Sequence, residues 1–155
     1  MDDKQLDTLR QLASSFRDAI EQVRVERAPG ALPFFPDGAC RMTSRLFAQY
    51  LAQQSASGAF GHAMLVSGVL PGSELGTRHY WLEVAGTVVD LTADPFGQPR
   101  VVIGLRTSFH QSLTECTAQS ASDALAALSS DETARLTRQL AAIEARLPAS
   151  GSSAA

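Results

Sequence analysis

The stretch Arg78–Thr92 constrains the fold more than any other part of the sequence. Apolar and polar side chains alternate on both sides of Ala85-Gly86, a pattern typical of two strands joined by a tight turn. With a two-residue turn, Val84 pairs with Thr87 and fixes the register of the hairpin. One face then carries an apolar and aromatic set that must pack against a core: Tyr80, Leu82, Val84, Val89 and Leu91.

The other face of this hairpin carries His79, Trp81 and Asp90. In the predicted register Trp81 lies opposite Asp90, which makes His79 and Asp90 diagonal neighbours about 7 Å apart. Nucleophilic triads place a base and its orienting acid in this way. A half-exposed hairpin with an incidental histidine and aspartate gives the same pattern. Trp81 favours a covered face, because an indole prefers burial to water.

Amphipathic patterns predict a helix at each end of the chain and one in between. The first covers about residues 3–27, and the last follows a capping box and covers about residues 130–147. Residues 28–37 are rich in proline and glycine and form a loop. A second helix then begins at about Cys40 and presents an apolar stripe to the core.

Two further strands are predicted at residues 63–70 and 101–105, whereas residues 108–122 are poorly patterned and are expected to be irregular. Consecutive strands with short links imply an antiparallel sheet, and helices at the chain ends imply an α+β fold. A length of 155 residues fits one domain. We expect that domain over residues 1–147 and a disordered tail at residues 148–155.

Composition and charge exclude several classes of function. The net charge of −3 and the scattered arginines provide no basic surface for nucleic acid. The polar N-terminus is unlike a secretory signal, and the apolar runs are too short to span a bilayer, so no membrane partner is expected. Cys40 and Cys116 are therefore predicted to be free thiols in a cytoplasmic protein.

Cys40 is the candidate nucleophile. It follows Asp37-Gly38-Ala39 and opens the second helix, so its thiol lies at the positive end of a helix dipole. That position favours the thiolate, which is the form that attacks an electrophile. The free amides of the first turn can in addition hold a developing oxyanion. A cysteine is also a common buried small residue, and position alone does not separate these two interpretations.

Two segments resemble the papain-like and transglutaminase-like cysteine enzymes of bacteria. Residues 35–46 around Cys40 are similar to their nucleophile helix, and His79–Val84 followed by Val89–Phe96 is similar to their histidine and aspartate strands. The order Cys, His, Asp and the separations of 39 and 11 positions match such small domains. The resemblance implies a core over residues 33–105, with a nucleophile helix packed on a small antiparallel sheet and the terminal helices as additions.

The resemblance further implies that Cys40, His79 and Asp90 form a catalytic triad that acts on an amide through a thioacyl intermediate. Peptide cleavage and the deamidation or crosslinking of a glutamine side chain are outcomes within this group. Papain-like proteases usually carry a glutamine oxyanion donor shortly before the nucleophile. None occurs in residues 34–39, which leaves the backbone amide of Cys40. Asp94 is expected to be a solvated turn acid, with a substrate contact as the alternative.

The remaining polar residues have smaller roles in this interpretation. We assign substrate contacts to Trp81 and Asp37. His62 and His110 lack a carboxylate at strand spacing, so each suits the role of base less well than His79. The three histidines are too dispersed for a metal-ligand motif, and we expect neither a metal nor a cofactor.

The sequence therefore predicts a cysteine hydrolase or acyltransferase whose partner is a peptide or protein substrate. The alternative is a non-catalytic domain that retains the fold and binds a peptide or protein in the cleft. Thiol reactivity separates the two, because only the enzyme needs an activated Cys40, while Cys116 is a bystander in both.

Overall fold

The computed structural model describes residues 1–54, 60 and 62–149. Its elements in chain order are α1 (Asp3–Val25), α2 (Cys40–Gln54), β1 (Ala63–Val69), β2 (Arg78–Val84), β3 (Thr87–Asp90), the 3-10 helix η1 (Asp94–Phe96), β4 (Val102–Gly104), α3 (Ser108–Ser112), β5 (Thr114–Ser120), α4 (Ala121–Ala126) and α5 (Ser130–Glu144). The predicted α+β class is confirmed, with one antiparallel sheet in this described part. No helix there is both long and apolar enough to cross a membrane. The predicted tail lies outside the described residues from residue 150 onward.

The central hairpin forms as predicted. Ala85 and Gly86 both have positive φ angles, 48° and 78°, as a two-residue turn between twisted strands requires. β2 pairs with β3 in the predicted register, with Val84 opposite Thr87. The apolar set on one face of the hairpin packs into the main core. The hairpin therefore fixes which side of the sheet faces that core and which side carries His79.

The prediction that residues 108–122 are irregular was wrong. They contain α3 and the edge strand β5, which pairs with β1 in the sheet order β4-β3-β2-β1-β5. The side chains of β5 are almost all exposed and mostly polar, so the strand carries no apolar alternation. Backbone pairing with β1 makes this segment a strand, and that pairing leaves no mark on its composition.

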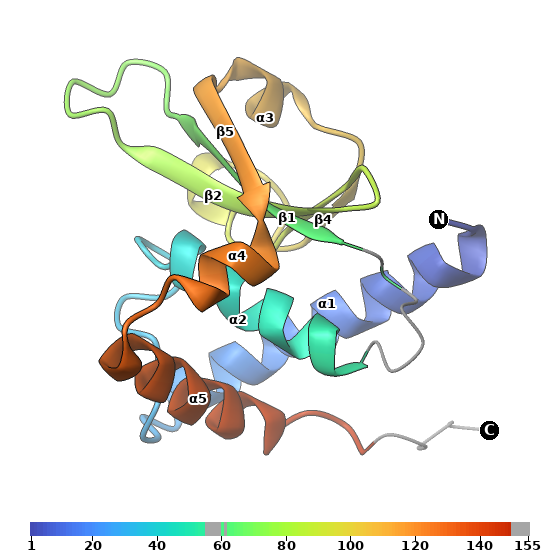
Figure 1. The fold of residues 1–155 in the computed structure, drawn as a ribbon, viewed down its shortest axis with the longest axis vertical. Coiled ribbons are helices and arrows are strands. Elements are labelled where there is room, and N and C mark those ends of the chain that lie inside the picture. The colour runs from blue at the N-terminus through green and yellow to red at the C-terminus, as the bar shows by residue number, and fades with distance from the viewer. Residues whose placement is uncertain (55–59, 61, 150–155) are drawn as a thin grey trace.

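The main core lies between the sheet and helices α1, α2, α4 and α5. Figure 1 shows α1, α2 and α5 gathered below the sheet, whereas α3 lies above it. Phe16 of α1 packs against Phe47 of α2 with ring centroids 5.0 Å apart, and Tyr50 lies beside both rings. As predicted, α2 begins at Cys40 and buries Leu46, Phe47 and Tyr50. Packing of this stripe fixes where the start of α2 meets the sheet.

A second and smaller core covers the opposite face of the sheet. Trp81 is fully buried there together with Val66, Val88 and Leu113. The prediction that another element covers Trp81 is confirmed, because Phe109 and His110 of α3 pack on this face. The polar side chains of the hairpin are thereby removed from water, which requires that each of them finds a hydrogen-bond partner.

Candidate active site

Cys40 lies in the first turn of α2. The first hydrogen bond of the helix runs from the Thr43 N–H to the Ala39 carbonyl at 2.9 Å. The N–H groups ahead of Thr43 have no partner within a helix, as at any helix start. No acidic residue lies in the first turn of α2, so no carboxylate of that turn opposes the positive end of the dipole. Cys40 is half-buried and free, and it therefore combines partial exposure with a site that favours negative charge.

His79 and Asp90 are bonded directly. The Nε2–H of His79 donates to Oδ2 of Asp90 at 2.6 Å, and both side chains are fully buried. The prediction that these two residues share one face of the hairpin is confirmed. Among the described residues, Nδ1 of His79 has no partner within ordinary hydrogen-bond geometry. Since Nε2 is taken by Asp90, Nδ1 is the atom left to interact with Cys40.

The protonation of His79 depends on both neighbours. Burial disfavours the imidazolium, but interactions with Asp90 and Cys40 outweigh it and raise the pKa of His79 to about 9. At neutral pH the ring is therefore positively charged. A charged imidazole beside a thiol stabilises the thiolate, and it also supplies a proton for a leaving group.

Asp90 accepts hydrogen bonds from other groups besides His79. Oδ1 accepts from the backbone N–H of Thr92 at 2.9 Å, and Oδ2 accepts from His110 as well as from His79. Burial alone would raise the pKa of this carboxyl. The bonds from His110 and His79, the charge of His79 and the Thr92 amide lower the pKa of Asp90 to about 2. Asp90 is thus a fixed negative charge in a dry site.

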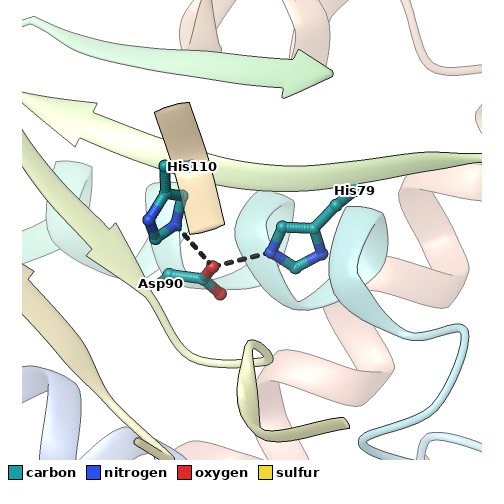
Figure 2. Close-up of side chains that lie close together, drawn as sticks. All are labelled: His79, Asp90 and His110. Carbon is teal, nitrogen blue, oxygen red and sulfur yellow. Dashed lines mark hydrogen bonds and ion pairs between the residues drawn. The ribbon is translucent and has the colours of Figure 1, made fainter. Parts of the chain in front are cut away.

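His110 is a site residue that sequence reasoning missed. Its Nε2–H donates to Oδ2 of Asp90 at 3.0 Å, and its Nδ1 lies 2.9 Å from the hydroxyl of Thr107, which caps α3. A neutral ring with its proton on Nε2 satisfies both contacts, because Nδ1 then accepts from Thr107. Figure 2 shows the His79 and His110 rings converging on one carboxylate oxygen. The only local signal for this position was the capping threonine ahead of it.

Aromatic rings enclose the imidazole of His79. Trp81 lies nearly parallel to it with centroids 6.0 Å apart, and Phe96 and Phe109 meet it edge-on at 5.1 and 5.4 Å. Phe96 and Phe109 also stack on one another at 5.1 Å, and Phe96 is 38% exposed. These rings exclude water around His79, which strengthens its interaction with Asp90.

The two residues to which we assigned substrate contacts lie in different environments. Trp81 has no exposed surface, and its indole N–H donates to Glu83 at 3.1 Å. Trp81 therefore packs against the ring of His79. Asp37 is exposed, and it lies in the turn that leads into α2. Asp37 is therefore open to solvent in the loop before Cys40, whereas Trp81 is covered by protein.

Arg17 joins the two segments that carry the candidate triad. This arginine of α1 is 2% exposed and holds both carboxylate oxygens of Asp94 at 2.9 Å. It also donates to the carbonyl of Leu91, next to Asp90, and it lies over the ring of Phe35 at 4.5 Å. Asp94 is therefore not the solvated turn acid that the sequence suggested. Through Arg17, α1 anchors both the segment after β3 and the loop before Cys40.

Within the described residues, one group of side chains could hold a metal ion. Single ligand atoms of His79, Asp90 and His110 all lie within 4.8 Å of one another, so the expectation that the three histidines are dispersed was wrong for His79 and His110, while His62 is not part of this group. Ligands on a tetrahedral ion at about 2.1 Å are roughly 3.4 Å apart. The 2.6 Å between His79 and Asp90 is shorter, as a shared proton requires. The spacing therefore favours a hydrogen-bonded network over a metal centre.

Comparison with known proteins gives no match to any family model, curated protein or solved structure. The chemistry of the site must therefore be argued from its own residues.

Proposed function

We propose that the chain has a papain-like or transglutaminase-like core and acts as a cysteine hydrolase or acyltransferase on an amide of a peptide or protein. The observation that carries this proposal is the 2.6 Å bond between His79 Nε2 and Asp90 Oδ2, with Nδ1 left for Cys40. One imidazole thus connects an acid to a thiol at a helix start. Nucleophilic enzymes activate a thiol by this arrangement.

In the acylation step the Cys40 thiolate attacks the carbonyl carbon and forms a C–S bond. The electron pair of the carbonyl moves to oxygen, where the free N–H groups at the start of α2 stabilise the oxyanion. As the carbonyl re-forms, the C–N bond breaks and the His79 imidazolium gives its Nδ1 proton to the departing amine. The product is a thioester on Cys40 and a neutral His79.

In the second step a water molecule or an amine attacks the thioester. Neutral His79 accepts the proton of the attacking group, and the C–S bond breaks to restore the thiolate and the imidazolium. Water gives hydrolysis, or deamidation when the amide is a glutamine side chain, whereas an amine gives a crosslink. Asp90 keeps the charged ring oriented, and His110 acts through Asp90 as a positioning residue.

The test uses p-nitrophenyl acetate, a small acyl donor that needs no substrate pocket. We expect a burst of p-nitrophenolate with an acetyl group on Cys40, detected by mass spectrometry of the peptides. The Cys40→Ser variant should lose the burst, and the Cys116→Ser variant, its matched control, should retain it. Addition of EDTA should change neither, because the proposed steps use no metal.

A different result supports the non-catalytic alternative. If both thiols are acetylated slowly and at the same rate, the fold would serve to bind a peptide and not to cleave it. Loss of the burst on addition of EDTA would instead make the His79, Asp90 and His110 group a metal centre.

A further inference from the structure

A cleft of about 430 Å³ lies between the loop before α2 and helix α5. On the side of the nucleophile its walls include Gly38, Ala39 and Met42. Cys40 lies between Ala39 and Met42 in the chain, so the cleft adjoins the start of α2. The triad does not account for the cleft, because His79 and Asp90 lie on β2 and β3 and do not line it.

The α5 side of the cleft carries two arginines and one buried amide. Arg135 and Arg138 line it and are exposed, and no ion pair involves either guanidinium within the described part of the chain. Gln139 lines it too, but its side chain is only 6% exposed. Among the described residues, its Oε1 atom has no hydrogen-bond partner. A buried acceptor without a partner costs free energy, which a ligand with an N–H group would recover.

Together these groups specify the chemistry of the ligand. A guanidinium presents a planar set of donors that fits a carboxylate, and two of them on successive turns of a helix favour an anion. Oε1 of Gln139 needs a donor at the same time. An acidic peptide carries both, a side-chain carboxylate and a backbone N–H. We propose that this cleft binds an acidic segment of a peptide, with its carboxylate on Arg135 and Arg138 and a backbone N–H on Gln139.

This inference rests on the proposed function in one respect, that the bound peptide is also the substrate of Cys40. The binding test uses two peptides of equal length, acetyl-Ala-Glu-Ala-amide and acetyl-Ala-Gln-Ala-amide, titrated into the full chain and followed by NMR. We expect the glutamate peptide to bind at least fivefold more tightly, with the largest shifts in the side-chain signals of Arg135, Arg138 and Gln139. Similar affinities for the two peptides would overturn the proposal.

Variants distinguish the contact of the carboxylate with the two arginines from the contact of the backbone N–H with Gln139. The double variant Arg135→Gln/Arg138→Gln should remove the preference for glutamate, and Gln139→Met should weaken both peptides alike because it removes the side-chain amide and leaves both arginines. Arg100→Gln is the matched control, since Arg100 is an exposed arginine that pairs with Asp18 away from the cleft. A preference that survives in the double variant would contradict the assignment of the carboxylate to these arginines.

A second readout distinguishes failure of the cleft from failure of the proposed function. Alkylation of Cys40 by iodoacetamide, a neutral reagent, should have the same rate in the double variant as in the wild type. If the glutamate preference is absent while Cys40 is activated, the cleft assignment fails alone. If the preference is present while Cys40 is inert, the proposed catalysis fails and the cleft belongs to a binding domain.

Discussion

The start of α2 and the edge strand β5 each carry one free cysteine, and the two thiols differ in exposure and in their neighbours. Cys40 is half-buried at a helix start and interacts with the charged ring of His79. Cys116 is exposed on an outer strand of the sheet, and its thiol contacts the carbonyl of Leu113 at 3.5 Å. Its exposure favours the modification of Cys116, whereas the charged ring of His79 favours the modification of Cys40.

Exposure of a thiol does not by itself make it reactive, because the thiolate is the reactive form. The thiol of Cys116 donates to the Leu113 carbonyl, a contact that requires the S–H proton. A thiol beside an imidazolium and free amide groups is stabilised in the charged form. Rates of modification at these two sites therefore measure the electrostatics of the candidate site, with Cys116 as an internal reference in the same molecule.

The largest effect is expected from His79→Ala. At neutral pH iodoacetamide should label Cys40 much faster than Cys116, and this substitution should lower the Cys40 rate about a hundredfold or more because the charged partner is lost. Mass spectrometry of both peptides against time measures it, and circular dichroism verifies the fold. His62→Ala is the control, since His62 is exposed. An unchanged ratio of the two rates would remove His79 from the site.

Asp90→Asn should also lower the labelling rate of Cys40, but by less than His79→Ala does. Without the carboxylate charge the pKa of His79 falls, and each unit of that fall leaves roughly tenfold less imidazolium above the pKa. We therefore expect the Cys40 labelling rate to fall roughly tenfold near pH 8, with less change near pH 6, where the ring is still protonated. A uniform loss at both pH values would indicate misfolding and not a lost charge.

His110 should tune the site through Asp90. His110→Leu removes one donor from Oδ2, which raises the pKa of Asp90 and should move the acid limb of the labelling profile to higher pH. Near neutral pH we expect a loss of about threefold, the size of one net hydrogen bond. His110→Gln keeps a donor and should restore the wild-type limb. Identical profiles for the two variants would reduce His110 to a packing residue.

The charge of His79 should also be visible in stability. A folded pKa above the unfolded value of 6.5 stabilises the fold fully below pH 6.5, and this stabilisation is lost as the pH rises through the folded pKa, about 9 in the wild type. Because thiols ordinarily titrate near pH 8.5, the measurement uses the Cys40→Ala variant. Its free energy of unfolding by urea should fall by on the order of 1 kcal/mol between pH 6.5 and 9. Cys40→Ala/His79→Gln should lack this fall, and parallel curves would contradict the raised pKa.

The smallest effect is expected from Cys116→Ser. The side chain is exposed and its single contact is weak, so the free energy of unfolding should change by less than about 0.5 kcal/mol. The Cys40 labelling rate should be unchanged. A tenfold change in that rate would show that the two regions are coupled, and Cys116 could then no longer serve as a reference.

Several parts of the site could be predicted because their signals are local. The hairpin turn at Ala85-Gly86 fixed which residues share a face with His79, and alternation alone sufficed for that. The approach to Cys40 ended in small turn residues ahead of an apolar stripe, and the helix begins at the predicted position. Neither inference required knowledge of any contact distant in the sequence.

Other parts could not be predicted because their partners are distant. The bond from His110 to Asp90 spans 20 positions, and the ion pair of Arg17 with Asp94 spans 77. In the sequence Arg17 is one more polar residue on an amphipathic helix, and only packing of α1 against the segment after β3 buries it. The sequence indicated His79 and Asp90 as a possible base and acid. It gave no sign that His110 and Arg17 hold them in place.

Three features could be derived from the residues alone: the helix that opens at Cys40, the hairpin, and the shared face of His79 and Asp90. These follow from repeat periods and turn chemistry, which act over a few residues. Three others depend on contacts between distant parts of the chain: β5 is a strand, His110 bonds to Asp90, and Arg17 anchors the site. The physical reason is burial. A polar side chain removed from water must find a partner, and which partner it finds depends on how the whole chain packs.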